Sequence, residues 1–310
     1  MNQDTWFAVV NPRSANGRTQ QLWPGYHRKI EQAGVKVVYA WTSGSGGGTE
    51  IAKQAFVEGY RRFIAVGGDG TVNEVLNGLI ENDRVLADNI ELAVFEQGTG
   101  GDLVRSLRPG LNKDLDSLIS LLIEPQTVLA DIGKVEYYDF QGNKAFRYFI
   151  NASNIGIGAE AVEQANRRSK ALGSKITYLR GAIATILTYK KSPVSVVTDQ
   201  KDVWKGNTWG LMVCNGKYIG GGMHIAPNAL IDDGYFDLVI IKDISRFNLI
   251  TRFPKIYRGT HIYDRAVEIK RCRTITLETP KSLLFEIDGE IPGMSPIDYR
   301  IIPECLKIRI

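Results

Sequence analysis

The chain has 310 residues, 44% of them hydrophobic and 23% charged, which is typical of folded globular domains and argues against whole-chain disorder. Its 38 lysines and arginines exceed its 34 aspartates and glutamates by only four, so the composition is not that of a dedicated nucleic-acid binder. Glycine is in excess, at 32 residues, and no Gly-X-Y period occurs. The glycines therefore indicate turns and ligand-binding loops rather than collagen.

The first third of the chain alternates short apolar runs with helical patterns. The predicted strands are residues 7–10, 35–41, 63–66 and 92–95, and the predicted helices are residues 19–33, 49–58, 71–80 and one from 102. Strands that alternate with helices predict a three-layer α/β domain with a mostly parallel sheet. Ligands of such sheets bind outside the carboxyl ends of the strands.

The pattern changes near residue 127 to a succession of β-branched and aromatic runs. The predicted strands are 127–135, 147–151, 194–198, 208–214, 236–241, 274–278 and 283–287, with one helical insertion at 174–189. We expect a β-rich sandwich domain over 128–291. A final strand near 306–310 is expected to return to the first domain, which then comprises 1–127 and 292–310.

The sequence does not suggest a secreted protein or a zinc site. The three cysteines are odd in number and form no Cys-x-x-Cys pair, which argues against disulfides or a zinc site. The first apolar run leads directly into a loop, unlike a signal peptide, and no run approaches the roughly 20 residues that span a bilayer. We expect a cytoplasmic protein without a transmembrane segment.

Basic residues are concentrated in two segments. Residues 167–191 contain seven basic residues and no acidic one, and residues 246–273 contain eight basic and two acidic residues. Two basic segments on an otherwise acidic body suit peripheral contact with an anionic membrane surface. Solvated helix faces explain the same pattern.

The central motif is Gly67-Gly68-Asp69-Gly70-Thr71, which follows a predicted strand and precedes a helix. It is neither the dinucleotide fingerprint nor a Walker loop. Glycines allow a backbone to lie against phosphates, and a helix start favours an anion. An aspartate beside phosphates is explained by Mg²⁺, whereas a capped turn explains the same residues without a ligand. Three more polar or glycine-rich loops, at 11–17, 42–46 and 97–102, are predicted at the same edge of the sheet.

The ordered motifs resemble the diacylglycerol kinase catalytic-domain family, which includes bacterial soluble lipid kinases and the sphingosine and ceramide kinases. The resemblance rests on Asn-Pro-x-Ser from residue 11, Gly-Gly-Asp-Gly-Thr-x-Asn-Glu from 67 and Gly-Thr-x-x-Asp from 98. It continues through 128–133, 149–152, 227–237 and 287–290, and so covers nearly the whole chain. It implies an ATP-binding first domain, a lipid-binding second domain and an active-site cleft between them.

The resemblance implies roles for particular residues. The residues that would contact ATP are Asn11, Pro12, Arg13, Ser14, Thr42, Gly67, Gly68, Asp69, Gly70, Thr71, Asn73, Gly98 and Thr99. Asp288 and Glu290 match the motif that carries the catalytic base, and Asp69 is the third catalytic candidate. On a continuous strand Asp288 and Glu290 would face one side. An Asp-Gly turn at 288–289 is the other interpretation.

A structural Mg²⁺ or Ca²⁺ is also implied. Its ligands would be the carboxylate of Asp233 and the carbonyls of Leu230 and Tyr235, with Asp131 joining through water. Oxygen donors suit these cations. An Asp-Asp-Gly hairpin turn explains the same residues without a metal.

The implied function is a cytoplasmic, peripherally membrane-associated lipid kinase of phospholipid biosynthesis that uses ATP and Mg²⁺, with diacylglycerol as its first candidate acceptor and a homodimer as one possible assembly. A sphingoid base or another alcohol is an alternative acceptor. The family usually has Pro before its Gly-Thr loop and Asn before the Asp of that loop, whereas this chain has Glu96-Gln97 and Gly101. These departures motivate a third hypothesis, a nucleotide-binding regulatory protein with impaired catalysis.

Overall fold

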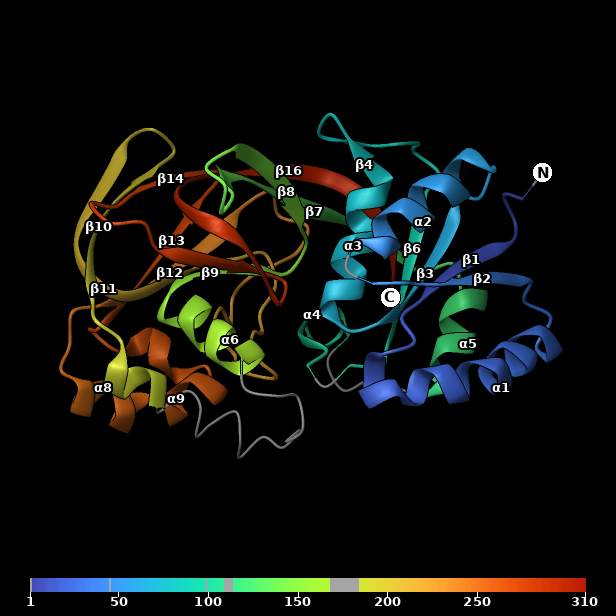
Figure 1. The fold of residues 1–310 in the computed structure, drawn as a ribbon, viewed down its shortest axis with the longest axis horizontal. Helices are drawn as coiled ribbons and strands as arrows, with labels where there is room; N and C mark the ends of the chain where they lie inside the picture. The colour runs from blue at the N-terminus through green and yellow to red at the C-terminus, as the bar shows by residue number, and fades with distance from the viewer. Residues whose placement is uncertain (1, 45, 99, 109–113, 168–183) are drawn as a thin grey trace. The chain divides into compact units, whose positions relative to one another are not determined.

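The computed structural model describes residues 2–44, 46–98, 100–108, 114–167 and 184–310, which form two compact units (Figure 1). Unit 1 comprises Met1–Ile132 and Ile302–Ile310, and unit 2 comprises Gly133–Ile301. The expected boundaries were 127 and 292. The observed ones fall later because the strands β7 (Thr127–Tyr138) and β16 (Glu290–Arg309) are long and each runs from one unit into the other. Thr99, residues 174–183 of the predicted helix 174–189 and most of the basic segment 167–191 lie outside the described residues.

Unit 1 is an α/β unit. Its elements in chain order are β1 (Trp6–Val10), η1 (Ser14–Gly17), α1 (Arg18–Gln32), β2 (Val37–Trp41), α2 (Gly47–Val57), β3 (Arg62–Gly67), α3 (Asp69–Leu79), β4 (Ile80–Glu81), β5 (Arg84–Val85), β6 (Glu91–Glu96), α4 (Asp102–Leu107) and α5 (Leu115–Ile123). Strands β2, β1, β3, β6 and the end of β16 lie in that order, and each neighbouring pair is parallel.

Helices cover both faces of the unit 1 sheet. Alternate residues of β1, such as Ala8 and Val10, share one core with Trp23 of α1 and Leu118 of α5. Helices α2 and α3 pack on each other and contact β1 and β3 from the other side. Trp23 is completely buried although Pro24 follows it inside α1. Burial of large side chains of this kind stabilises the unit by roughly 1.5–3 kcal/mol each.

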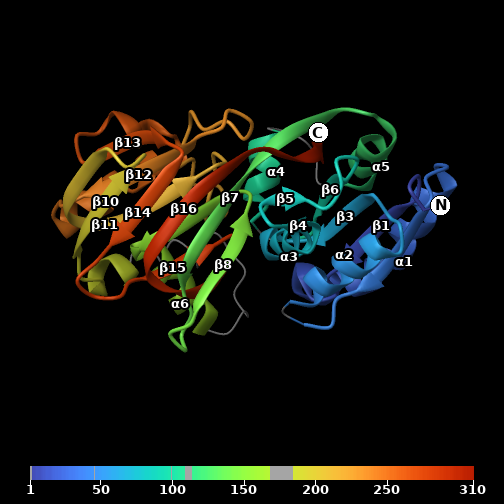
Figure 2. The ribbon, with the colours of Figure 1, turned by 90° about the horizontal axis from the view of Figure 1, so that it is seen from above.

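Unit 2 is β-rich. Besides parts of β7 and β16 it contains β8 (Lys144–Phe149), β9 (Ala152–Gly156), α6 (Ile157–Arg167), β10 (Ser192–Thr198), β11 (Asp202–Cys214), β12 (Phe236–Lys242), α8 (Arg246–Arg252), α9 (Pro254–Tyr257), η2 (Thr260–Tyr263), β13 (Val267–Cys272), β14 (Thr274–Glu278) and β15 (Leu284–Ile287). Neighbouring strands of unit 2 pair in antiparallel fashion, whereas those of the unit 1 sheet are parallel. The sheet as a whole is therefore mixed. Figure 2 shows β14 beside β16.

The unit 2 strands enclose a shared core. Side chains from strands far apart in the sheet order, such as Phe149 of β8, Phe236 of β12 and Tyr299 of β16, belong to one buried cluster. The rings of Phe149 and Phe236 are stacked with centroids 5.7 Å apart. A single helical insertion was predicted, and this is wrong, because α6, α8 and α9 are also helical and pack on the outer side of β11 and β12. Among the residues that the structure describes, no helix is both long and apolar enough to cross a bilayer.

Candidate functional site

The strands of the unit 1 sheet end together at one edge. Val10 at the end of β1 is paired with Trp41 of β2 and Val66 of β3, and Gly67 is paired with Glu96 of β6. The four loops that follow these strands therefore start at the same level. This places the predicted nucleotide-contact residues of all four loops along one edge of unit 1.

The loop after β1 is bonded to the start of α3. The side-chain amide of Asn11 donates to the Thr71 hydroxyl at 3.1 Å, and the Asn11 backbone N–H donates to the Val66 carbonyl at 2.9 Å. The Asn11 side-chain oxygen accepts from the Arg13 N–H at 2.9 Å, so the loop turns tightly around Pro12. The Ser14 hydroxyl closes the turn by donating to the Asn11 carbonyl at 2.8 Å. The structure thus places Asn11, in the loop after β1, next to Thr71 of α3. Both are predicted nucleotide-contact residues.

The loops after β3 and β6 lie backbone against backbone. A Cβ on Gly98 would stand 2.8 Å from the Gly68 Cα, so residue 98 has no room for a side chain. The carbonyl of Gly67 accepts from the Gln97 N–H at 2.8 Å, which holds the two loops in register. The glycines therefore allow the β3–α3 and β6–α4 loops to lie close together at this edge of the sheet.

Helix α3 begins at this contact. Gly68 is its N-cap residue and, having no side chain, makes no side-chain cap of its own. Asp69, its first residue, directs its Oδ2 toward the β6–α4 loop, where a Cβ on Gly100 would lie 3.0 Å from that oxygen. The glycine N-cap of an 11-residue helix next to a carboxylate suits phosphates accompanied by a cation.

Two predicted contact residues lie inside the unit. Asn73 is only 1% exposed, and its side-chain oxygen accepts from Asn77 at 3.2 Å within α3. Thr42 is 8% exposed, and its N–H donates to the Val10 carbonyl at 2.9 Å. In this structure both residues fix the backbone of the site.

Glu74 is a site residue that the sequence analysis did not assign. Its carboxylate is buried and accepts from the N–H groups of Gly46 at 2.7 Å and Gly48 at 2.8 Å, at the start of α2. Its carbonyl accepts from the Thr49 hydroxyl at 2.9 Å. Glu74 therefore caps α2 from α3 and fixes the loop after β2. The only sequence signal was its place at the end of the Gly-Gly-Asp-Gly-Thr-x-Asn-Glu motif.

The two departures from the family pattern have structural explanations. The Glu96 side chain folds back, so that its Oε1 accepts from the Gly98 N–H at 2.6 Å within the loop. Gly101, the N-cap residue of α4, has a φ of +64° and a ψ of 39°, the left-handed conformation. Glycine and asparagine are the two residues that adopt this conformation most readily. Replacement of the usual Asn by Gly101 therefore keeps the backbone of the loop.

This explanation predicts opposite outcomes for two substitutions at residue 101. Gly101→Asn should leave the free energy of unfolding within about 0.5 kcal/mol of the wild-type value, whereas Gly101→Ala should lower it by about 1–2 kcal/mol, because alanine is strained at positive φ. Urea denaturation of both variants measures the difference. Equal loss in the two variants would show that space, rather than backbone conformation, selects glycine here.

In unit 2 the predicted base motif forms a tight hairpin between β15 and β16. Ile287 pairs with Glu290, so that Asp288 and Gly289 form a two-residue loop with φ of 44° and 96°. Two consecutive positive φ values are typical of a type I′ turn, for which Asp-Gly is a preferred sequence. The interpretation in which Asp288 and Glu290 share one side of a continuous strand is wrong, because the turn separates them.

The Asp288 side chain is buried against the loop between β8 and β9. Its carboxylate accepts from three backbone N–H groups, those of Ile150 at 3.2 Å, Asn151 at 3.3 Å and Ala152 at 3.1 Å. Three amide donors stabilise the ionised form and fix its orientation. The side chain of Asp288 is thus fixed in position at the tip of the hairpin.

Two further carboxylates flank this turn. Glu290 is about one-third exposed and accepts from the Arg147 guanidinium at 2.6 Å. Glu286, which the sequence analysis did not single out, is buried and accepts from the side-chain amide of Asn154 and from the Gly289 N–H. The turn is therefore held from both sides by charged hydrogen bonds.

The predicted carboxylate ligand of the cation in unit 2, Asp233, already has partners. Asp233 accepts from the Tyr235 N–H at 3.0 Å with one oxygen and from the Arg271 guanidinium at 2.6 Å with the other. Burial raises the pKa of neighbouring Asp237 to about 6, against the opposing effect of Arg271. Within the described ranges, no group of three or more His, Cys, Asp or Glu side chains is placed to hold a metal.

The fit to a structural cation is therefore incomplete. The donor atoms of Asp233 and of the Leu230 and Tyr235 carbonyls are of the right chemical type, but Arg271 already balances the charge of Asp233. A cation there would have to replace this guanidinium, which is 54% exposed. Asp131, in unit 1, is fully buried and accepts from the Glu304 N–H at 2.8 Å. We assign no chemical step to a metal at these residues.

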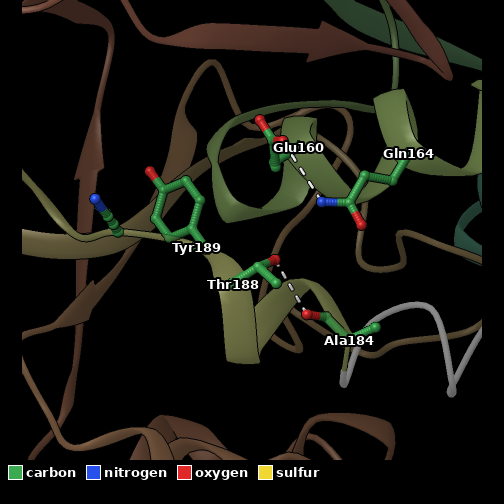
Figure 3. Close-up of a pocket in the computed structure, with 6 residues that line it drawn as sticks. Glu160, Gln164, Ala184, Thr188 and Tyr189 are labelled. Carbon is green, nitrogen blue, oxygen red and sulfur yellow. Dashed lines mark hydrogen bonds between the residues drawn. The ribbon is translucent and has the colours of Figure 1, made fainter.

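Unit 2 also holds a pocket of about 550 Å³ beside α6 (Figure 3). Its walls are Glu160 and Gln164 of α6 and residues 184 and 188–190. Figure 3 shows Glu160, Gln164 and Tyr189 around a common space, with the Gln164 amide 3.5 Å from a Glu160 carboxylate oxygen. The polar lining suits a hydrophilic ligand better than an acyl chain.

Comparisons with known proteins agree with this arrangement. The family model "Diacylglycerol kinase catalytic domain" matches residues 5–135, and "YegS C-terminal NAD kinase beta sandwich-like domain" matches residues 152–310. The chain is 27% identical over 294 residues to the diacylglycerol kinase of Bacillus subtilis (strain 168), covering 94% of this chain and 91% of that protein. It is 25% identical over 300 residues to the diacylglycerol kinase of Staphylococcus carnosus (strain TM300), covering 97% and 93%.

The fold is shared with solved structures. A diacylglycerol kinase structure from Bacillus anthracis strain Sterne covers 100% of this chain and 97% of its own, with a TM-score of 0.72 at 20% identity. The two family models lie in sequence order and together cover most of the chain, including the motifs that begin at residues 11, 67 and 98 and those at 128–133, 227–237 and 287–290. The chain therefore belongs to the diacylglycerol kinase catalytic-domain family.

Proposed function

We propose that this protein is an ATP-dependent lipid kinase that transfers the γ-phosphoryl group of ATP to a lipid hydroxyl, with diacylglycerol as the first candidate acceptor and phosphatidic acid as the product. Membership of the family and the names of its relatives support this proposal. The observation that carries it is the edge of unit 1, where the glycine-capped start of α3, Asp69 and the adjoining loops of Gly68 and Gly98 lie together.

The edge is suited to a nucleotide. Phosphates would lie against the glycine backbones and the start of α3, where N–H groups and the helix dipole favour negative charge. Asp69 is the residue that would hold Mg²⁺ beside those phosphates, and the ion would neutralise charge on the transferred group. Asn11 and Thr71, bonded at 3.1 Å, keep the two loops at a fixed separation.

The acceptor chemistry is proposed for unit 2. As the acceptor oxygen attacks the γ-phosphorus, the bond from that phosphorus to ADP breaks and the hydroxyl proton must pass to a base. We assign this role to Asp288, because its carboxyl group is held by three N–H donors at the tip of a hairpin. Glu290 then acts as a positioning residue through its ion pair with Arg147.

A panel of acceptors tests the substrate class. The purified protein would be incubated with ATP, Mg²⁺ and, separately, a short-chain diacylglycerol, a monoacylglycerol, a sphingoid base, a ceramide or free glycerol, and phosphorylated product would be measured. We expect the fastest turnover with diacylglycerol. Faster turnover with a sphingoid base would replace the acceptor and keep the kinase, whereas product from glycerol alone would contradict a lipid substrate.

The alternative of a catalytically impaired regulatory protein is disfavoured. It was motivated by Glu96 and Gly101, but Gly101 keeps the left-handed turn and Glu96 bonds within its own loop. Asp288 and the glycines at 67 and 68 are in place as well. Among the described residues of this loop, neither departure thus gives a reason for a loss of nucleotide binding.

A further inference from the structure

The helical stretch of α8 and α9 packs on unit 2 by one side only. Leu249 and Ile256 are buried in the core that lies outside β11 and β12, and Ile250 and Phe253 pack against the same core. Leu249 and Ile256 are seven residues apart, two helical turns, so they mark the inner side of the stretch. Phe247 lies away from this side and is 74% exposed.

Two tyrosines extend the aromatic character of this region. Tyr257, in α9, is 40% exposed, and Tyr263, in η2, is 84% exposed. Helix α9 packs against both α8 and η2, so the three elements form one contiguous segment of the surface. We refer to residues 246–265 as the α8–η2 surface. Several exposed aromatic side chains on adjoining elements are characteristic of surfaces that bind an apolar partner.

The same surface is basic. Its single acid, Asp264, accepts from Arg252 at 2.6 Å and from Lys255 at 3.1 Å. Arg258 and Arg265 are exposed, and neither has an ion-pair partner within the part of the chain that the structure describes. The surface thus presents uncompensated positive charge next to exposed aromatic rings.

The surface also borders the polar pocket of unit 2. Arg246, at the start of α8, donates to the carbonyl of Tyr189 at 3.0 Å, and Tyr189 lines that pocket. Lys190, the next residue, is exposed and lines it too. Figure 1 shows α8 and α9 at the same edge of unit 2 as the helical turn before Tyr189.

We propose that the α8–η2 surface docks this protein on an anionic lipid bilayer. Phe247 and Tyr263 would enter the headgroup region, where aromatic rings are favoured, and Arg258 and Arg265 would meet lipid phosphates. A nucleic-acid duplex would use the positive charges but, with its bases stacked inside, would leave the exposed Phe247 without a partner, so the bilayer explains more of the surface. The inference rests on the proposed function in one respect: a lipid acceptor lies in a bilayer, so the enzyme must reach one.

Vesicle co-sedimentation of the full chain tests this surface. The protein would be mixed with vesicles of phosphatidylcholine alone or with an equal share of phosphatidylglycerol, at low and high salt. We expect binding to the anionic vesicles that weakens with salt. Phe247→Ala/Tyr263→Ala and Arg258→Glu/Arg265→Glu should each weaken the partition coefficient at least about tenfold.

Matched controls lie elsewhere on unit 2. Phe140→Ala removes an exposed ring from the β7–β8 turn, and Lys201→Glu/Lys205→Glu makes the same charge change on exposed residues of the β10–β11 hairpin. Both should bind vesicles like the wild type. Thermal unfolding checks that every variant is folded.

The possible results separate this proposal from the kinase proposal. Equal losses in the control variants, wild-type binding by the α8–η2 variants, or no binding to anionic vesicles would each overturn the docking surface. Tighter binding to a DNA or RNA duplex than to vesicles would overturn it in favour of a nucleic-acid partner. Phosphorylation of a detergent-solubilised diacylglycerol should be unchanged in the α8–η2 variants, so absent activity with intact vesicle binding would refute the kinase alone.

Discussion

Replacement of Asp288 by asparagine is expected to lower turnover about 10²- to 10⁴-fold, because the base that accepts the hydroxyl proton is lost. The backbone should tolerate the change, since asparagine adopts the left-handed conformation that residue 288 has, with a φ of 44°. The measurement is kcat with saturating ATP and the best lipid of the acceptor panel.

Two controls keep this result interpretable. An asparagine amide cannot accept from all three N–H groups of residues 150–152, so a loss of stability of about 1–3 kcal/mol is expected as well, and unfolding must be measured beside turnover. Glu290→Gln, which weakens the pair with Arg147, should cost less than about tenfold in kcat if Glu290 only positions the hairpin. A folded Asp288→Asn variant with near-normal kcat, or a larger loss in Glu290→Gln, would reverse the assignment.

Removal of the Glu74 carboxylate is expected to have the largest effect on stability. Glu74→Ala leaves the N–H groups of Gly46 and Gly48 without their charged acceptor at a buried helix start. The free energy of unfolding should fall by about 2–4 kcal/mol, and protection of these two amides against hydrogen exchange should be lost. Urea denaturation and amide exchange measure the two effects.

Two further variants serve as controls for the loss of stability expected in Glu74→Ala. Glu74→Gln keeps one oxygen acceptor and should lose roughly half as much stability. Glu50→Ala removes an exposed carboxylate from the first turn of the same helix and should cost less than about 1 kcal/mol. If Glu74→Ala behaves like Glu50→Ala, the carboxylate does not organise the loop after β2.

The sequence was most informative where local chemistry decides the structure. Apolar runs that end in glycine-rich or polar loops marked the strands of unit 1, and the parallel register then placed their ends at one edge. The loops at Asn11, Gly68 and Gly98 could be predicted because a strand end, glycines and a following helix are contiguous in the chain.

Other features depend on residues that only the fold brings together. Glu74 caps residues 26 and 28 positions away, and Asp288 accepts from amides 136–138 positions away, which no spacing rule reveals. The pairing of Asp233 with Arg271, 38 positions apart, is of the same kind, and it changed the interpretation of the predicted cation site. Helices α8 and α9 were missed because they are short, with seven and four residues.

The departure at Gly101 shows how a sequence difference can leave a site unchanged. From the sequence, loss of an asparagine side chain suggested a weaker loop. The structure places the residue at positive φ, where glycine and asparagine are the two favoured residues, so the backbone requirement explains both.

The central claim is the transfer of the terminal phosphoryl group of ATP to a lipid. The most direct test supplies the protein with diacylglycerol in detergent micelles and ATP labelled either in its γ- or in its α-phosphate, and measures label in the organic phase. The account predicts that γ-label enters the lipid fraction, that α-label does not, and that Asp288→Asn abolishes most of the transfer. Label absent from every lipid on the panel, with nucleotide bound and the fold intact, would contradict it.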